Sequence, residues 1–395
     1  MKARTAVLLA SLALGACRSA PDYGRQLPEG WPALIELGPG EAHPAFGSQW
    51  RERAEILPAL ERSIAWTRSK HSERFFPIEG IDHARALASL ERLKELLEES
   101  RSEEDFELAM ASEFTVYESA GWDGEGGGVL FTGYCTPILP GRLEADDEFS
   151  HPLYALPDDL VKGEDGAILG RRTDSGTVPY PTRSAIESSA MLAGKGLELV
   201  WLRDPLDAFI AHVNGSAFIQ LEDGRRIGFG YAGKNGREYT SLGRELVRDG
   251  ELDRDEVGLP AIRAWAAAHP DRVQEYLNRN DSYVFFTPIE GKPRGSLNVE
   301  VTGSRTLATD KTLFPRGAPV FVTTHLTTKS GQRIPFRKLL FDQDTGGAIR
   351  TAGRADIYLG IGPEAEGLAG RTQSEGQLYY LFLKPEAFAL REMAQ

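Results

Sequence analysis

The stretch ADIYLGIGPEA at residues 355–365 says most about how this chain folds. Asp356 opens a short run of strand-favouring residues, and the glycines and proline that follow end that run in a turn. Because apolar neighbours exclude water, an aspartate placed here is expected to have a raised pKa, as a general acid requires. Holding it protonated near neutrality takes a shift of about 3 pH units, or roughly 4 kcal/mol.

Two further acids stand in comparable surroundings upstream. Asp344 begins the stretch DTGGAI at residues 344–349, and Asp310 ends ATD at residues 308–310. Each acid borders an apolar or glycine-rich segment. Aspartates of this kind also cap ordinary turns through hydrogen bonds to the backbone, and the pattern alone leaves both interpretations open.

The rest of the chain divides into an N-terminal helical region and a longer region of strands. Apolar residues recur at helical spacing between residues 54 and 64 and between 87 and 97, and Asp82 is positioned to cap the second helix. From Glu113 onward, short apolar runs predict strands. These runs lie at 114–117, 129–132, 197–201, 217–221, 227–229, 283–287, 320–326, 339–341, 355–359 and 378–383, and further helices are expected at 242–248, 260–269 and 272–277.

The N-terminus predicts export. Lys2 and Arg4 precede a small, apolar run that is too short to span a bilayer, where about 20 residues are needed. The block Leu-Gly-Ala-Cys at 14–17 resembles the lipobox of bacterial lipoproteins, which implies a signal peptide at 1–16 and an acylated Cys17. Arg18 after the cysteine favours the outer membrane, facing the periplasm. A plain signal peptide cleaved near Ala20 is the alternative.

Composition limits the classes of function. The 395 residues favour two domains. Loss of Lys2 and Arg4 with the signal changes the formal charge from −13 to −15, and such a surface repels nucleic acid and anionic headgroups. If Cys17 carries lipid, Cys135 has no disulfide partner. The proline- and glycine-rich segment 17–49 is predicted to be a tether.

Motifs of several other enzyme classes are missing. The seven histidines show no zinc-binding spacing, and neither a Gly-x-Ser-x-Gly block nor a P-loop occurs. Gly360 and Gly362 lack the third glycine of a dinucleotide fingerprint. The Asp342-x-Asp344 pair lacks the remaining ligands of a calcium loop. We therefore expect neither a metal nor a cofactor.

At its three acids the sequence resembles the membrane-bound lytic murein transglycosylase A family, whose C-terminal module is named for three aspartates. The resemblance continues upstream in the same order, from about residue 131 to 384. It differs at Cys135, where relatives commonly have a second tyrosine, at Asn214 and Ala217 on either side of Gly215-Ser216, and at 371–374. The upstream blocks lie at 131–134, 181–183, 207–210, 215–216, 231–236 and 282–286.

The resemblance implies a mainly β fold with N-terminal helices. A double-psi β-barrel domain, residues 50–137 plus 291–395, would be interrupted by an inserted β-rich domain at 138–290. The glycan would lie in the groove between them. Peptidoglycan strands are then the expected substrate, and cell-wall synthesis or division proteins are candidate partners.

The resemblance also implies a mechanism. Asp356 would protonate the oxygen between N-acetylmuramic acid and N-acetylglucosamine, then accept the proton of the muramyl 6-hydroxyl as a 1,6-anhydro ring closes. An intramolecular nucleophile reaches effective molarities of about 10⁵ M or more, so the second acid of ordinary glycosidases is dispensable. Asp344 and Asp310 would support the site or brace turns.

Groove contacts are expected from Thr132 and Tyr134 at the domain junction and from Lys234 and Asn235 in a turn, where loop architecture is an equal competitor. Two other functions remain open: an inactive peptidoglycan-binding lipoprotein, and a hydrolytic glycosidase on the same fold.

Overall fold

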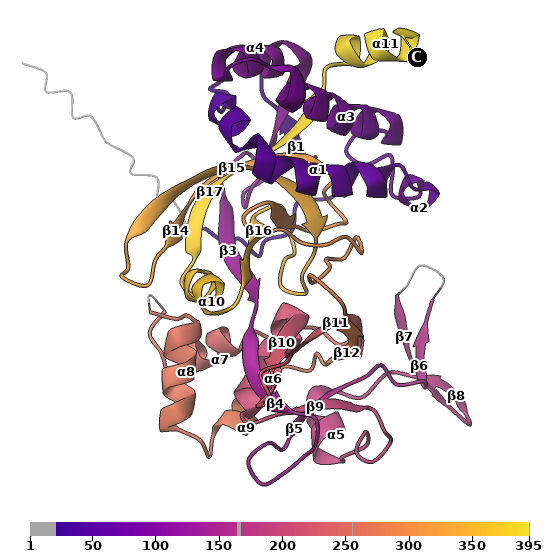
Figure 1. The fold of residues 1–395 in the computed structure, drawn as a ribbon, viewed down its shortest axis with the longest axis vertical. Helices are drawn as coiled ribbons and strands as arrows, with labels where there is room; N and C mark the ends of the chain where they lie inside the picture. Colours follow the sequence, from indigo (N-terminus) through magenta and orange to yellow (C-terminus); the bar gives the residue numbers. More distant parts are fainter. Residues whose placement is uncertain (1–20, 164–166, 255, 395) are drawn as a thin grey trace, which may run out of the picture.

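The computed structural model describes residues 21–163, 167–254 and 256–394. Figure 1 shows two parts: a barrel covered by helices, and a second part below it, built from the middle of the chain. The predicted signal peptide and Cys17 lie outside the described residues. Within those ranges, no helix is long and apolar enough to cross a membrane.

Six strands form a closed ring, which confirms the predicted barrel. Each strand pairs with the next, and β17 pairs with β3 to close the ring. Apolar side chains such as Phe131, Leu340 and Ile357 fill the interior with no exposed surface. In order around the ring, the strands are β3 (Val129–Thr136), β16 (Arg354–Ile361), β13 (Thr306–Ala308), β15 (Arg333–Asp344), β14 (Pro319–Thr327) and β17 (Gln373–Leu383), and β2 (Phe114–Ser119) and β1 (Leu34–Glu36) extend the sheet from β17.

A helical layer covers one side of this barrel (Figure 1). Asp82 caps α3 by accepting from the Arg85 amide at 2.7 Å, as predicted, and Ser102 caps α4. Leu60 and Leu93 are fully buried in a cluster with Phe321 of β14. The layer comprises η1 (Gly47–Glu52), α1 (Arg53–Thr67), α2 (Lys70–Glu73), α3 (His83–Glu99), α4 (Glu103–Glu113) and α11 (Pro385–Ala394), while α10 (Pro363–Ala369) lies at the opposite end of the barrel.

The predicted tether at 17–49 is wrong from residue 21 onward, because residues 21–49 pack against the barrel and its helices. Residues 34–36 form β1 and pair with β2. Ala33 and Phe46 are 1% and 4% exposed in apolar clusters. The carbonyl of Tyr23 accepts a 2.6 Å hydrogen bond from the Thr351 hydroxyl of the barrel. The prolines and glycines of this segment therefore belong to turns of an ordered chain, whose few apolar side chains supply enough buried surface to fix it.

The inserted part is built around a six-stranded sheet of order β12-β11-β10-β4-β9-β5. The helices predicted near 242–248, 260–269 and 272–277 are present, and two further helices, Arg183–Ser188 and Pro205–Asn214, were not expected. Asp204 caps the second of these, α6, and Gly215 ends it with a φ of 67°. The strands are β4 (Ile138–Arg142), β5 (His151–Tyr154), β9 (Glu198–Leu202), β10 (Ser216–Gln220), β11 (Arg226–Lys234) and β12 (Val284–Ile289), with a separate small sheet of β6 (Leu160–Lys162), β7 (Ile168–Thr173) and β8 (Gly176–Val178). The helices are α5 (Arg183–Ser188), α6 (Pro205–Asn214), α7 (Leu242–Arg248), α8 (Leu259–Ala268) and α9 (Val273–Leu277).

Candidate active site

Four adjoining strands of the barrel bring distant parts of the sequence into one row. Asp344 of β15 pairs with Ala308 of β13, which pairs in turn with Asp356 of β16. Asp356 also pairs with Thr132 of β3 on its other side. Residues directly opposite each other in a sheet project to the same face. The row therefore places the two acids on one face, separated by a strand that contributes only a methyl group.

Alternate residues of β3 and β16 extend this face. Arg354 and Tyr358 flank Asp356 at two-residue spacing, which is the same side of a strand. On β3, Tyr134 follows Thr132 in the same way. The rings of Tyr134 and Tyr358 lie 5.1 Å apart. Two parallel strands thus present carboxyl, hydroxyl and guanidinium groups side by side.

Asp356 is the carboxyl group best suited to hold a proton. Its Oδ1 is buried and has no hydrogen-bond partner among the described residues. Burial raises its pKa from 3.8 to about 7, while the positive charge of Arg354 and the Thr132 hydroxyl oppose the rise, and the negative charge of Asp344 adds to it. Desolvation disfavours the charged carboxylate, so at neutral pH a substantial fraction of the group is protonated.

Asp344 lies in the same row but has different surroundings. Tyr134 donates its hydroxyl to Oδ2 at 2.7 Å, and the amides of Ser296 and Thr345 each donate to Oδ1 at 2.8 Å. Burial raises the pKa of Asp344, and these three hydrogen bonds oppose the rise. With both oxygens occupied, the carboxylate holds Tyr134 and the loop around residue 296 in place.

Asp310 belongs to the scaffold behind this face. It is 4% exposed, and its Oδ1 accepts from the amide and hydroxyl of Thr312. Its Oδ2 accepts from the amide of Thr351 at 3.0 Å. Thr351 has a φ of 86°, an unfavourable value for a β-branched residue. Asp310, together with Tyr23, therefore fixes the strained residue that leads into β16.

The two residues expected to contact glycan from the glycine-bearing turn of the insert have different surroundings in the structure. Lys234 is half-buried, and burial lowers its pKa, as does the positive charge of Arg350 from the barrel. Asn235 is only 2% exposed, and its amide group bonds four backbone groups of the insert. Because its hydrogen-bonding capacity is used internally, Asn235 does not support the predicted glycan contact. Lys234 stays a candidate.

Sequence reasoning missed two groups near the acid. Arg354 donates to the Thr132 hydroxyl at 3.3 Å, and its charge acts on Asp356. Its position two residues before Asp356 on a strand was a usable signal. Tyr239 belongs to the insert but lies against the barrel. A Cβ atom added at Gly347 of the barrel would be 3.4 Å from the Cβ of Tyr239. Nothing in the sequence pattern indicates that contact.

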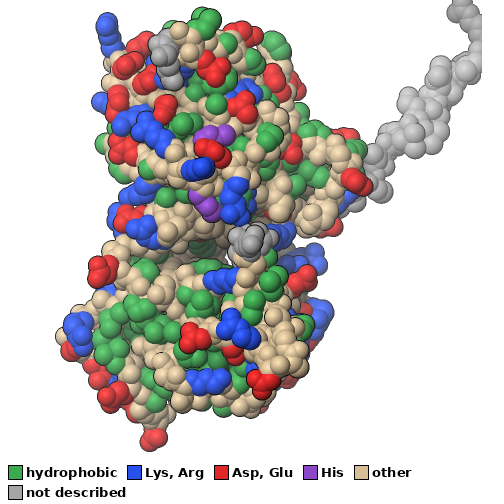
Figure 2. Space-filling view, turned by 90° about the vertical axis from the view of Figure 1, so that its right-hand side faces the viewer, with side chains coloured by type: hydrophobic (Ala, Val, Ile, Leu, Met, Phe, Trp, Pro, Cys, Tyr) green, Lys and Arg blue, Asp and Glu red, His purple; other side chains and the backbone are tan. Residues whose placement is uncertain are grey.

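Contacts from helix α8 and the residue that begins it join the insert to the barrel. Arg263 of α8 bonds both Asp207 of α6 and Glu366 of α10, at 2.7 and 3.0 Å. The amide of Leu259 donates to the carbonyl of Gly370 at 3.2 Å. Figure 2 shows the surface hollowed between the upper and lower parts of the molecule. The face carrying Asp356 belongs to the barrel, near the insert residue Tyr239.

The chemistry available here is proton transfer. Among the residues that the structure describes, no cluster of three histidine, cysteine or acidic side chains could hold a metal ion. The Cys135 thiol is 3% exposed, and burial raises its pKa to about 12, so it is not a nucleophile. A single carboxyl group that is partly protonated near pH 7 is equipped to act first as an acid and then as a base.

Comparisons with known proteins agree with this architecture. The family model described as the MltA specific insert domain matches residues 130–287, and the 3D domain model matches residues 305–382. Two membrane-bound lytic murein transglycosylases A are each 34% identical to this chain. The protein from Vibrio cholerae matches over 65% of this chain and 66% of its own length, and that from Escherichia coli K12 over 67% and 70%.

Solved structures extend the match to nearly the whole chain. A membrane-bound lytic murein transglycosylase from Agrobacterium tumefaciens is 28% identical with a TM-score of 0.73, covering 90% of this chain and 99% of that one. E. coli MltA with bound chitohexaose is 27% identical with a TM-score of 0.69, covering 93% and 100%. The chain therefore belongs to the membrane-bound lytic murein transglycosylase A family.

Proposed function

We propose that this protein is a murein lytic transglycosylase that cleaves the bond between N-acetylmuramic acid and N-acetylglucosamine without water. Family membership supports the activity, and E. coli MltA, a relative by structure, binds a chitin hexasaccharide. The observation that carries the chemistry is Asp356: one oxygen has no partner among the described residues, and the pKa is about 7.

The proposed reaction uses one carboxyl group twice. Protonated Asp356 gives its proton to the glycosidic oxygen as the bond from that oxygen to C1 breaks. The muramyl 6-hydroxyl then attacks C1, and its proton passes to the Asp356 carboxylate. The products are a free N-acetylglucosamine 4-hydroxyl and a 1,6-anhydromuramyl end, and the enzyme regains its starting protonation state.

The surrounding residues have supporting roles in this proposal. Asp344 positions Tyr134, and its negative charge favours the positive charge that develops at C1. Asp310 fixes the segment that leads into β16. Thr132, Tyr134 and Lys234 are proposed glycan contacts. No cofactor enters any step.

The test is the chemical nature of the cleaved ends. Purified murein is incubated with the full chain in water enriched in ¹⁸O, and the released muropeptides are analysed by mass spectrometry. Anhydromuramyl ends without heavy oxygen are expected. Reducing ends that contain ¹⁸O would mean a hydrolase, and binding without new ends would mean a glycan-binding lipoprotein.

We also propose that an acyl chain on Cys17 anchors the protein in the outer membrane, facing the periplasm. The lipobox-like Leu-Gly-Ala-Cys block supports this. Labelling with radioactive palmitate in a Gram-negative host is expected for the natural chain and should be lost in Cys17→Ser. Equal labelling of both proteins would rule the anchor out.

A further inference from the structure

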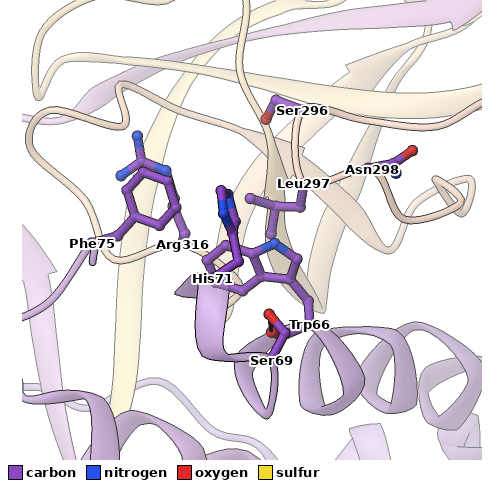
Figure 3. Close-up of a pocket in the computed structure, with 8 residues that line it drawn as sticks. All are labelled: Trp66, Ser69, His71, Phe75, Ser296, Leu297, Asn298 and Arg316. Carbon is purple, nitrogen blue, oxygen red and sulfur yellow. Dashed lines mark hydrogen bonds between the residues drawn. The ribbon is translucent and has the colours of Figure 1, made fainter. Parts of the chain in front are cut away.

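A separate cavity lies between the helical layer and the barrel. It measures about 320 Å³ and is bounded by the end of α1, the region around α2, the loop at residues 296–298 and Arg316 (Figure 3). None of the residues that form the proposed acid site lines it. Its size is at the lower end of the range for small-molecule sites, enough for one or two amino-acid residues.

Two aromatic rings and the Arg316 guanidinium line this cavity, and Arg74 lies beside it. The rings of Trp66 and Phe75 are stacked, with centroids 6.0 Å apart and planes inclined by 24°. The Arg316 guanidinium lies over the Phe75 ring at 4.1 Å, and that of Arg74 lies at 5.1 Å from the same ring. Figure 3 shows Arg316 against Phe75, with His71 beside them.

Neither guanidinium has a carboxylate partner. In the described parts of the chain, no aspartate or glutamate oxygen lies within 4.0 Å of Arg316 or Arg74. Arg316 donates one hydrogen bond, from Nη1 to the carbonyl of Lys311 at 2.9 Å. Arg316 therefore keeps donors free for an anion, while the charges of Asp342 and Asp310 act on it from beyond ion-pair distance.

The cavity wall is directly connected to the proposed acid site. The amide of Ser296 donates to Asp344, whose other oxygen holds Tyr134. The amide of Leu297 donates to the carbonyl of Gln343 on β15 at 3.4 Å. The loop at residues 296–298 therefore lines the cavity and also contacts β15 at the proposed acid site.

We propose that this cavity binds a carboxylate of the murein stem peptide, an inference that rests on the proposed function. In peptide-bearing murein the free carboxylates belong to the stem peptide, because the lactyl carboxyl group of each muramic acid residue is bound to the peptide as an amide. Arg316 would receive the carboxylate through its free donors. The partly exposed side of the Trp66 ring would contact the aliphatic part of the same amino-acid residue, while Phe75, which is covered by Trp66 and Arg316, holds both in place. The enzyme would then prefer glycan that still carries its peptides.

The proposal is tested by binding of a synthetic stem tetrapeptide to the full chain, followed by calorimetry. Arg316→Gln is expected to weaken binding about tenfold. Amidation of the peptide carboxylates should have a similar effect. Arg74→Gln, at an exposed position where folding is not at risk, should give a smaller loss in the same direction. Arg316→Gln should also lower the ratio of cleavage rates on peptide-bearing and peptide-free glycan.

Arg53→Gln is the matched control. Arg53 also lies 4.1 Å from an aromatic ring, that of Trp50, and donates to one carbonyl at 2.8 Å, but it is not part of the cavity. It should bind the peptide as the natural chain does. Equal binding by Arg316→Gln and the natural chain would overturn the proposal, as would inorganic phosphate competing as strongly as the peptide.

The two proposals fail separately. Peptide binding that depends on Arg316 in a protein that forms no anhydromuramyl ends would retain the cavity and reject the transglycosylase. Cleavage of murein without such binding would do the reverse. Measuring peptide binding in Asp356→Asn as well keeps the readout independent of turnover.

Discussion

Asp342 lies on β15 and Asp356 on β16, and both strands pair with β13. The two carboxyl groups nevertheless differ in their ion pairs and hydrogen bonds. Asp342 is fully buried and forms an ion pair with Lys311. Its Oδ2 accepts from the hydroxyls of Thr309 and Tyr380 at 2.7 and 2.8 Å. Asp356 has no ion pair of this kind, and its Oδ1 has no partner in the described structure.

The difference separates a structural acid from the acid that we propose to be reactive. A cation and several hydrogen-bond donors compensate a buried carboxylate for its lost hydration, whereas a buried carboxyl group without them is more easily protonated. Both environments occur in one barrel, on two strands that are separated only by β13. Three substitutions, each used with its control or reference condition, can test this contrast.

The largest effect is expected on catalysis. Asp356→Asn keeps the shape of the side chain but cannot donate or accept the required proton. The rate of anhydromuropeptide formation should fall by about 10³-fold or more. Glycan binding and the circular dichroism spectrum should stay as in the natural chain. Near-normal turnover would assign the acid to another residue.

The same change at the paired acid should instead unfold the protein more easily. Asp342→Asn leaves the Lys311 ammonium buried without a counter-charge, which costs about 3–5 kcal/mol of unfolding free energy. Urea denaturation at pH 7 measures this loss. The matched control is Asp174→Asn, at an exposed turn position, which should unfold like the natural chain. A stability unchanged by Asp342→Asn would remove the contrast between the two acids.

The third effect is smaller and has the opposite sign. The folded pKa of Asp356, about 7, is higher than its unfolded value near 3.8, so ionisation of this group favours the unfolded chain as pH rises from 4 to 7. Asp356→Asn removes that penalty of roughly 4 kcal/mol at pH 8, but the buried amide has its own desolvation cost, so a net stabilisation of about 1–3 kcal/mol is expected. Thermal unfolding at pH 8 and pH 5 should show the gain shrinking at the lower pH. A destabilised variant at pH 8 would mean that the carboxylate is well solvated.

Much of this arrangement was predictable from local pattern. Asp356 could be placed on a strand among apolar neighbours, and Asp82 at a helix start, because both depend on adjacent residues. The family resemblance supplied the barrel and the proposed role of the acid. The outcome at Asp356 agrees with the raised pKa that its apolar surroundings predict.

What could not be predicted depends on contacts between distant segments. The row that joins Asp344, Asp356 and Thr132 is set by the register of strands from three parts of the chain. The engagement of Asn235 by four backbone groups and the packing of residues 21–49 arise from tertiary structure in the same way. Composition alone indicated a surface turn and a tether at these places.

The smallest expected effect tests how the barrel adjusts Asp356. The rate should fall about tenfold per pH unit above pH 7, because the reaction needs the protonated acid. The charge of Arg354 lowers the pKa of Asp356, so Arg354→Gln should move this alkaline limb of kcat/KM upward by about 1 pH unit or less. Arg333→Gln, at an exposed position on β15, removes the same charge and should leave the limb in place. A limb that moves in neither variant would mean that a group other than Asp356 controls it; a limb that moves equally in both would mean that overall charge, rather than the neighbour two residues away on the strand, sets the pKa.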